Sequence, residues 1–136
     1  MDTSTTDIGG LPLPAALLRA IGNGAWKPPQ DAEVIRNVFG DEPDWTQFYD
    51  LPTIVRQNQF FQSKSQAEVE GEVPGSGDGM GISPPFAVLI GSLGADMPIA
   101  LDYRLSRIVP RVIYLGAEGW REIAPNFEGL LTRLGL

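Results

Sequence analysis

Carboxylates are the residues of this 136-residue chain whose types and spacing come closest to a chemical site. Asp41, Glu42, Asp44 and Asp50 surround Trp45 within ten residues. Clustered carboxylates can bind a hard cation, supply the acid and base of a glycosidase, or face a basic protein. The spacing does not match an EF-hand calcium loop, which needs a bidentate Glu at its last position. A solvated acidic turn and a protein-contact surface are therefore the two main interpretations.

Histidine and cysteine are both absent from the sequence. Histidine is the usual acid–base catalyst near neutral pH, a cysteine thiolate is a nucleophile, and both are common zinc ligands. The composition therefore excludes Ser-His-Asp, Cys-His and the common zinc chemistries. We expect no catalytic residue, no metal and no cofactor, and a hydrolase that uses Asp or Glu stays open as a third hypothesis.

The segment Gly75–Gly81 is rich in glycine, as phosphate-binding loops are. A Walker loop needs a Lys followed by Ser or Thr, and here Asp78 would repel a phosphate. Ser83, Pro84 and Pro85 follow, so the strand–turn–helix context of a dinucleotide site is also missing. The pattern predicts a mobile surface loop around residues 74–82.

Three tryptophans lie next to charged, proline or glycine residues: Trp26, Trp45 and Trp120. Large aromatic residues near turns either anchor interfaces or close the edge of a core. We interpret Trp120 as core and leave both possibilities open for the other two, with Trp45 as the better candidate for an anchor. The candidate protein-binding residues are therefore Asp41, Glu42, Asp44, Trp45, Asp50 and Trp26.

The charge balance limits the possible partners. The chain holds 17 acidic and 10 basic residues, a formal net charge of −7, and the whole excess precedes residue 86. Nucleic acids and anionic membranes attract clustered Lys and Arg, so this balance favours a basic protein as partner. The longest mainly apolar run, Pro84–Gly91, is far shorter than the ~20 residues that span a bilayer. The first ten residues have no signal-peptide features, and we expect a cytoplasmic protein.

The first part of the chain has the pattern of helices separated by turns. Apolar spacing predicts a helix over 14–21 and another over 32–39, the latter capped by Asp31. Residues 45–49 have a strand-like composition. Asp50 can cap a third helix, whose apolar face is formed by Leu51, Ile54, Val55 and Phe61.

The last 50 residues have the pattern of strands followed by a helix. Phe86–Ile90, Ile99–Tyr103 and Arg111–Leu115 predict an antiparallel meander of three strands. A final helix is predicted from the spacing of Phe127, Leu130, Leu131 and Leu134, with Asn126 as its cap. The predicted fold is α+β, with a central antiparallel sheet flanked by N-terminal helices and a C-terminal helix. We expect a disordered tail over residues 1–10 and a single domain over 11–136.

One polar residue lies within the predicted meander. Asp102 is expected on the opposite face of its strand from Ile99 and Leu101. It can pair with Arg104 or Arg111 in a cross-strand ion pair of modest value. A structural role is therefore the favoured interpretation.

The order of short motifs resembles the SUKH superfamily in its Smi/Knr-type branch. The matching segments are Leu89–Ser92, Pro98–Asp102, Pro110–Tyr114, Trp120 and Ile123–Leu131, preceded by Leu11–Pro14 and Asn23-Gly24. The resemblance implies an α+β fold without enzymatic activity. It also implies that the shared residues are structural, here Gly91, Asp102, Tyr114, Trp120, Phe127 and Leu131.

The resemblance also implies a function. Many bacterial members of this superfamily look like immunity proteins that neutralise toxins of polymorphic or contact-dependent systems, and fungal members are scaffold-like regulators of cell-wall synthesis. We expect a non-enzymatic protein-binding module, an immunity protein whose partner is a basic toxin domain. A housekeeping interaction scaffold with no toxin partner stays open.

Overall fold

The computed structural model describes residues 7–43, 45–62, 82–94, 97–116 and 119–136. Asp44 and the predicted glycine-rich loop as far as residue 81 lie outside these ranges.

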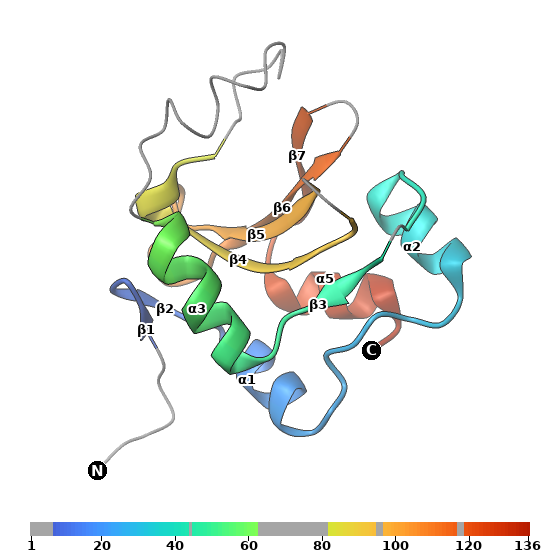
Figure 1. Ribbon diagram of the computed structural model, residues 1–136, viewed down its shortest axis with the longest axis horizontal. Coiled ribbons are helices and arrows are strands. Elements are labelled where there is room, and N and C mark those ends of the chain that lie inside the picture. Colours follow the sequence, from blue (N-terminus) through green and yellow to red (C-terminus); the bar gives the residue numbers. More distant parts are fainter. Residues whose placement is uncertain (1–6, 44, 63–81, 95–96, 117–118) are drawn as a thin grey trace.

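A five-stranded antiparallel sheet forms the centre of the fold (Figure 1). Its strands follow the chain order and are β3 (Gln47–Phe48), β4 (Ala87–Ser92), β5 (Pro98–Asp102), β6 (Arg111–Gly116) and β7 (Gly119–Ala124). Each strand pairs with the next one along the chain. The predicted α+β fold with an antiparallel meander is confirmed.

The α-helices of the described residues are α1 (Ala15–Gly22), α2 (Ala32–Phe39), α3 (Leu51–Phe61) and α5 (Phe127–Leu134), and a short 3-10 helix η1 (Pro84–Phe86) precedes β4. Side chains cap three of the helices at the predicted positions. Asp31 accepts from Glu33 N–H, Asp50 from Thr53 N–H and Asn126 from Gly129 N–H. The caps satisfy backbone donors that a helix leaves unpaired in its first turn, and so they set where these helices begin.

Apolar residues are buried on both faces of the sheet. The helices and one face share a large cluster that includes Leu17, Ile35, Ile54, Leu130, Val88, Ile90, Leu101 and Tyr114. α5 contacts α1, α2, β6 and β7, while α3 lies along β4 (Figure 1). The other face carries a smaller cluster of Phe61, Ile82, Ala87, Ala100, Ile113 and Trp120. Ile82 is fully buried, so the prediction that the surface loop extends to residue 82 is wrong at that end.

The N-terminal tail is shorter than predicted. β1 (Asp7–Ile8) and β2 (Leu11–Pro12) form an antiparallel hairpin. Its turn uses Gly9 and Gly10, both at positive φ, a backbone conformation that glycine adopts without steric cost. Ile8 is buried and the Tyr103 hydroxyl donates to Pro12 O at 2.6 Å, so residues 7–10 belong to the folded domain.

Strand β7 is absent from the sequence-based prediction. Val112 pairs with Ala124 but Ile113 pairs with Glu122, so the intervening Ile123 is an extra residue in β7. A β-bulge of this kind shifts the alternation of inward and outward side chains. The extra residue leaves Ile123 and Ala124 as consecutive buried residues of the larger cluster, and Arg121 and Glu122 before them are both exposed. This pattern has no period of two that would identify a strand in the sequence.

Two amide side chains, one from Asn58 in α3 and one from Gln62 at its C-cap, pair with the backbone of β4 where β3 does not reach. Asn58 Nδ2 donates to Leu89 O at 2.9 Å, and Leu89 N–H donates to Asn58 Oδ1 at 2.8 Å. Gln62 Nε2 donates to Ala87 O at 3.0 Å. Unpaired strand edges are sites of aggregation, and these amides satisfy backbone groups that a neighbouring strand would otherwise pair. α3 thus replaces part of a strand.

The last helix allows a prediction that separates two adjacent leucines. Leu130 is fully buried, whereas Leu131 is only partly buried, so the expectation that both lie in the core is corrected for Leu131. Leu130→Ala should lower the free energy of unfolding by about 2–5 kcal/mol because it leaves a cavity, and Leu131→Ala by clearly less. Urea titration of both variants, followed by circular dichroism, measures the difference. Equal losses would contradict this packing.

Candidate protein-binding surface

Trp45 is the most exposed large apolar residue of the described chain, with 83% of its surface accessible. Its φ is +65°, in the left-handed region that a bulky side chain rarely occupies. A non-glycine residue in such a region costs of the order of 1–3 kcal/mol and persists where the surroundings impose it. Of the two positions that the sequence left open for Trp45, the structure has the exposed one, and the backbone geometry is an additional feature of the site.

Contacts with the sheet hold the chain on both sides of Trp45. On the C-terminal side, the Thr46 hydroxyl donates to Leu93 O at 3.3 Å. On the N-terminal side, the Tyr114 hydroxyl donates to Asp41 Oδ2 at 2.9 Å. Burial raises the pKa of Tyr114, and the hydrogen bond to Asp41 raises it further, so the phenol stays a donor. Trp45 therefore projects from a part of the chain that is anchored to β4–β6.

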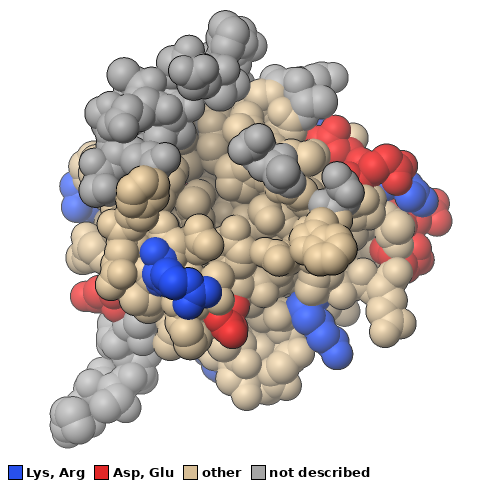
Figure 2. All heavy atoms as spheres, viewed as in Figure 1, with Lys and Arg blue, Asp and Glu red and all other residues tan. Residues whose placement is uncertain are grey.

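The acidic residues near Trp45 do not form a uniform solvated patch. Asp41 is half-buried and engaged by Tyr114, whereas Glu42 is exposed and pairs with Arg36 at 3.2 Å. Asp50 caps α3, and its pKa is lowered because the Thr53 side chain and backbone donate hydrogen bonds to it. Figure 2 shows acidic side chains gathered where Figure 1 places α2, with basic atoms among them. Of the described members, Glu42 is therefore the one exposed carboxylate near Trp45 that neither caps a helix nor binds a core side chain; its partner is the surface residue Arg36.

Trp26 is not a surface residue, which corrects its place among the candidate binding residues. It is buried, stacks on Phe48 with ring centroids 4.1 Å apart, and meets the edge of Phe127 at 5.1 Å. Stacked and edge-on geometries are those that aromatic pairs prefer in cores. The prolines that follow Trp26 in the sequence gave no indication of this burial.

The residues that the family resemblance marks as structural lie in the core or at close contacts. Trp120, Phe127 and Tyr114 are buried, and Leu131 packs against the larger cluster. Gly91 lies where β3 pairs with β4, opposite Phe48. A Cβ at this position would lie 2.6 Å from Gln47 O, so a larger residue would displace β3.

Asp102 is fully buried because its face of the sheet is also covered, by the smaller apolar cluster that contains Ile113 and Trp120. Arg104 Nε donates to its Oδ1 at 2.9 Å and Arg111 Nε to its Oδ2 at 2.7 Å. Burial alone would raise the pKa of Asp102, but the hydrogen bonds from the two arginines outweigh it and hold the pKa below its usual value. The predicted pairing is confirmed with both arginines at once, whereas the burial was not expected.

The described residues carry nine acidic and nine basic side chains. The net charge of −7 of the whole chain therefore comes from residues outside the described ranges. Attraction of a basic partner by the net charge therefore stays a prediction, and the described residues do not concentrate that charge at Trp45.

Two other kinds of site are absent from the described residues. No group of three or more Asp and Glu side chains there is arranged to hold a metal ion. No helix in that part of the chain is long and apolar enough to cross a membrane.

Comparisons with protein-family models, with curated proteins and with solved structures found no match for this chain.

Proposed function

We propose that this protein is a protein-binding module that contacts its partner through Trp45, and that it acts as an immunity protein against a toxin. The observation that carries the binding function is the exposed indole at a left-handed backbone position, held on both sides by the sheet. The resemblance to SUKH proteins supports the narrower assignment to immunity.

Trp45 has the properties of an interface anchor. Tryptophan is enriched among the few interface residues that carry most of the binding energy. A side chain whose backbone is already fixed loses less conformational entropy on binding, which improves affinity. The local strain and the exposure both act against stability of the free protein, and burial of the indole by a partner compensates for the exposure.

Electrostatics contributes mainly to the rate of association. Charged groups at the rim of an interface change the association rate, whereas buried anchors change the dissociation rate. Glu42 is such a rim group because it is exposed and lies near Trp45 in the chain. Its ion pair with Arg36 reduces its effect on a basic partner.

Binding kinetics test the two roles. The proposal predicts a toxin gene next to this one, and the probe is the toxin domain that the neighbouring gene encodes, immobilised and titrated with the full chain. Trp45→Ala should raise the dissociation constant by at least about 30-fold, corresponding to about 2 kcal/mol, mostly through faster dissociation. Glu42→Gln should slow association at low salt, with an effect that shrinks as salt screens the charge.

Phe60→Ala is a matched control because Phe60 is also a highly exposed aromatic residue, on α3. It should leave both rates unchanged. A Trp45→Ala variant that dissociates at the rate of the unsubstituted protein would refute the anchor.

The immunity function has its own test. Cells that produce the neighbouring toxin should survive when this chain is co-produced, and Trp45→Ala should reduce survival. If co-production of the intact chain does not raise the survival of these cells, or if no toxin gene lies next to this one, the housekeeping scaffold is favoured instead.

A further inference from the structure

A second exposed apolar surface lies at the other end of the sheet from Trp45. β4 pairs with β3 and with the start of β5 at Ser92, and with the end of β5 at Ala87. The segment between β5 and β6 therefore emerges at the end opposite to β3. Three apolar side chains of this segment are exposed: Leu105 by 75%, Ile108 by 78% and Val109 by 56%.

Side-chain contacts hold this segment in place. Ser106 Oγ accepts from the N–H groups of Ile108 and Val109, at 3.2 and 3.0 Å. The Arg107 guanidinium lies 4.4 Å from the centre of the Phe86 ring, a cation–π contact. At the start of the segment, Arg104 is bound to the buried Asp102. The apolar side chains are thus presented by a preorganised segment, which lowers the entropic cost of binding.

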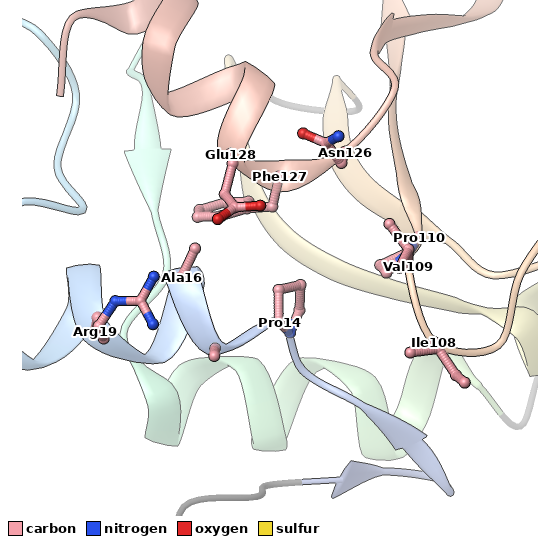
Figure 3. A pocket seen from close by; sticks show the side chains of 10 residues that line it. Pro14, Ala16, Arg19, Ile108, Val109, Pro110, Asn126, Phe127 and Glu128 are labelled. Carbon is pink, nitrogen blue, oxygen red and sulfur yellow. The ribbon is translucent and has the colours of Figure 1, made fainter.

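A pocket adjoins the exposed side chains. Its cavity of about 240 Å³ is bordered by the start of α1, the start of α5 and the β5–β6 segment (Figure 3). Pro14, Ala16, Phe127, Val109 and Pro110 supply apolar surface. A dry cavity of about 150 Å³ already admits a benzene ring, so this pocket is large enough for one aromatic or aliphatic side chain.

The charges around the pocket favour a carboxylate-bearing partner. Residues 103–111 contain three arginines and no acidic residue. Arg19 from α1 lines the pocket, where Glu128 is the one carboxylate among the lining residues (Figure 3). Arg104 and Arg111 are matched by the carboxylates of Asp102 and Glu122, so the positive charge offered to a partner comes from Arg19 and Arg107.

We propose that the pocket and the Leu105–Val109 segment form a second docking surface, which binds an acidic protein segment by inserting one of its apolar side chains. The carboxylates of that segment pair with Arg19 and Arg107, while Ile108 and Val109 cover the inserted side chain. The concave shape and Glu128 at the pocket suit a peptide better than an anionic bilayer. This surface is independent of Trp45 and of the proposed immunity function.

A peptide titration tests the proposal. The full chain, labelled with ¹⁵N, is titrated to millimolar concentration with the end-blocked peptide Asp-Glu-Phe-Asp-Glu. Amide signals of Ala16, Ile108, Val109 and Phe127 should shift, while that of Thr46, beside Trp45, should not. A peptide with Ala in place of Phe, and one with Lys in place of every acidic residue, should each bind at least tenfold more weakly.

Variants define the site. Ile108→Asp should weaken binding of the acidic peptide at least tenfold because it adds a negative charge beside the pocket, and Arg19→Gln should weaken it several-fold. Both positions are exposed, so the dispersion of the other amide signals should be retained. Trp45→Ala should leave peptide binding unchanged, which separates this result from the outcome for the proposed function.

Several outcomes would overturn the proposal. These are the absence of shifts at the pocket amides, equal binding of the Lys peptide, and unchanged binding by Ile108→Asp. Sedimentation of the chain with phosphatidylserine vesicles, abolished by Ile108→Asp, would assign the surface to a membrane instead. A dimer in analytical ultracentrifugation that Ile108→Asp dissociates would assign it to a second copy of this chain.

Discussion

Asn58→Leu is expected to lower the free energy of unfolding by about 2–6 kcal/mol, because a buried backbone donor and acceptor left without a partner cost about 1–3 kcal/mol each. The two groups are Leu89 N–H and Leu89 O, which the Asn58 amide satisfies at 2.8 and 2.9 Å. The amide also donates to Ile54 O at 2.7 Å, which fixes its orientation. A domain has a total stability of about 5–15 kcal/mol, so this is a large share.

Gln57→Leu on the same helix is the matched control, since Gln57 is exposed. It should change the stability by no more than about 0.5 kcal/mol. Urea unfolding followed by tryptophan fluorescence gives both values. The Asn58 variant should also aggregate more readily, because part of the β4 edge becomes available to another strand. Similar stabilities for the two variants would show that the Asn58 amide does not support β4.

Local chemistry made most helices predictable from the sequence. Asp31, Asp50 and Asn126 each precede an apolar pattern by one residue or a few, and each caps its helix in the structure. A cap and the helix that it starts are neighbours in the chain, so no tertiary information is needed.

Features that depend on distant partners were missed for a shared reason. Asn58 has no distinguishing pattern in the sequence, because its role depends on a strand edge 31 residues away. The extra residue Ile123 hides β7, because it shifts the alternation that a strand would show. Asp102 was expected on the face of its strand opposite to Ile99 and Leu101, and its burial follows from the packing of Ile113 and Trp120 on that face.

The candidate site was predicted in part. The sequence left an exposed and a buried position open for both Trp45 and Trp26, and the structure exposes Trp45 and buries Trp26 against Phe48 and Phe127. Local composition does not distinguish the two tryptophans, because burial depends on which aromatic residues the fold brings near. The positive φ of Trp45 has no sequence signal, since glycine is the usual residue in that region.

Asp102→Asn is expected to lower the free energy of unfolding at pH 7 by about 3–5 kcal/mol, because removing one member of a buried ion pair leaves its partners uncompensated. Here the partners are Arg104 and Arg111, which approach the carboxylate at 2.9 and 2.7 Å. Asparagine has nearly the same shape, so the change tests the charge and not the packing.

Glu122→Gln provides the control for this substitution. Glu122 pairs with the same Arg111 at 3.4 Å, but its side chain is partly exposed. Exposed pairs contribute about 0–1 kcal/mol, so this variant should be close to the unsubstituted protein in stability. A loss in Glu122→Gln as large as that in Asp102→Asn would mean that the burial of Asp102 is not what makes its charge important.

The pH dependence supplies a second measure of the same carboxylate. The pKa of Asp102 is lowered in the folded protein, so its ionised form stabilises the fold at pH values above the ordinary aspartate pKa of about 4. This contribution is lost as the pH falls below that value and through the folded-state pKa. The Asp102→Asn variant lacks the titrating group, so it has no such contribution to lose as the pH falls. The difference in unfolding free energy between the two proteins should therefore narrow from pH 7 to pH 3 in urea titrations, and a constant difference would contradict the lowered pKa.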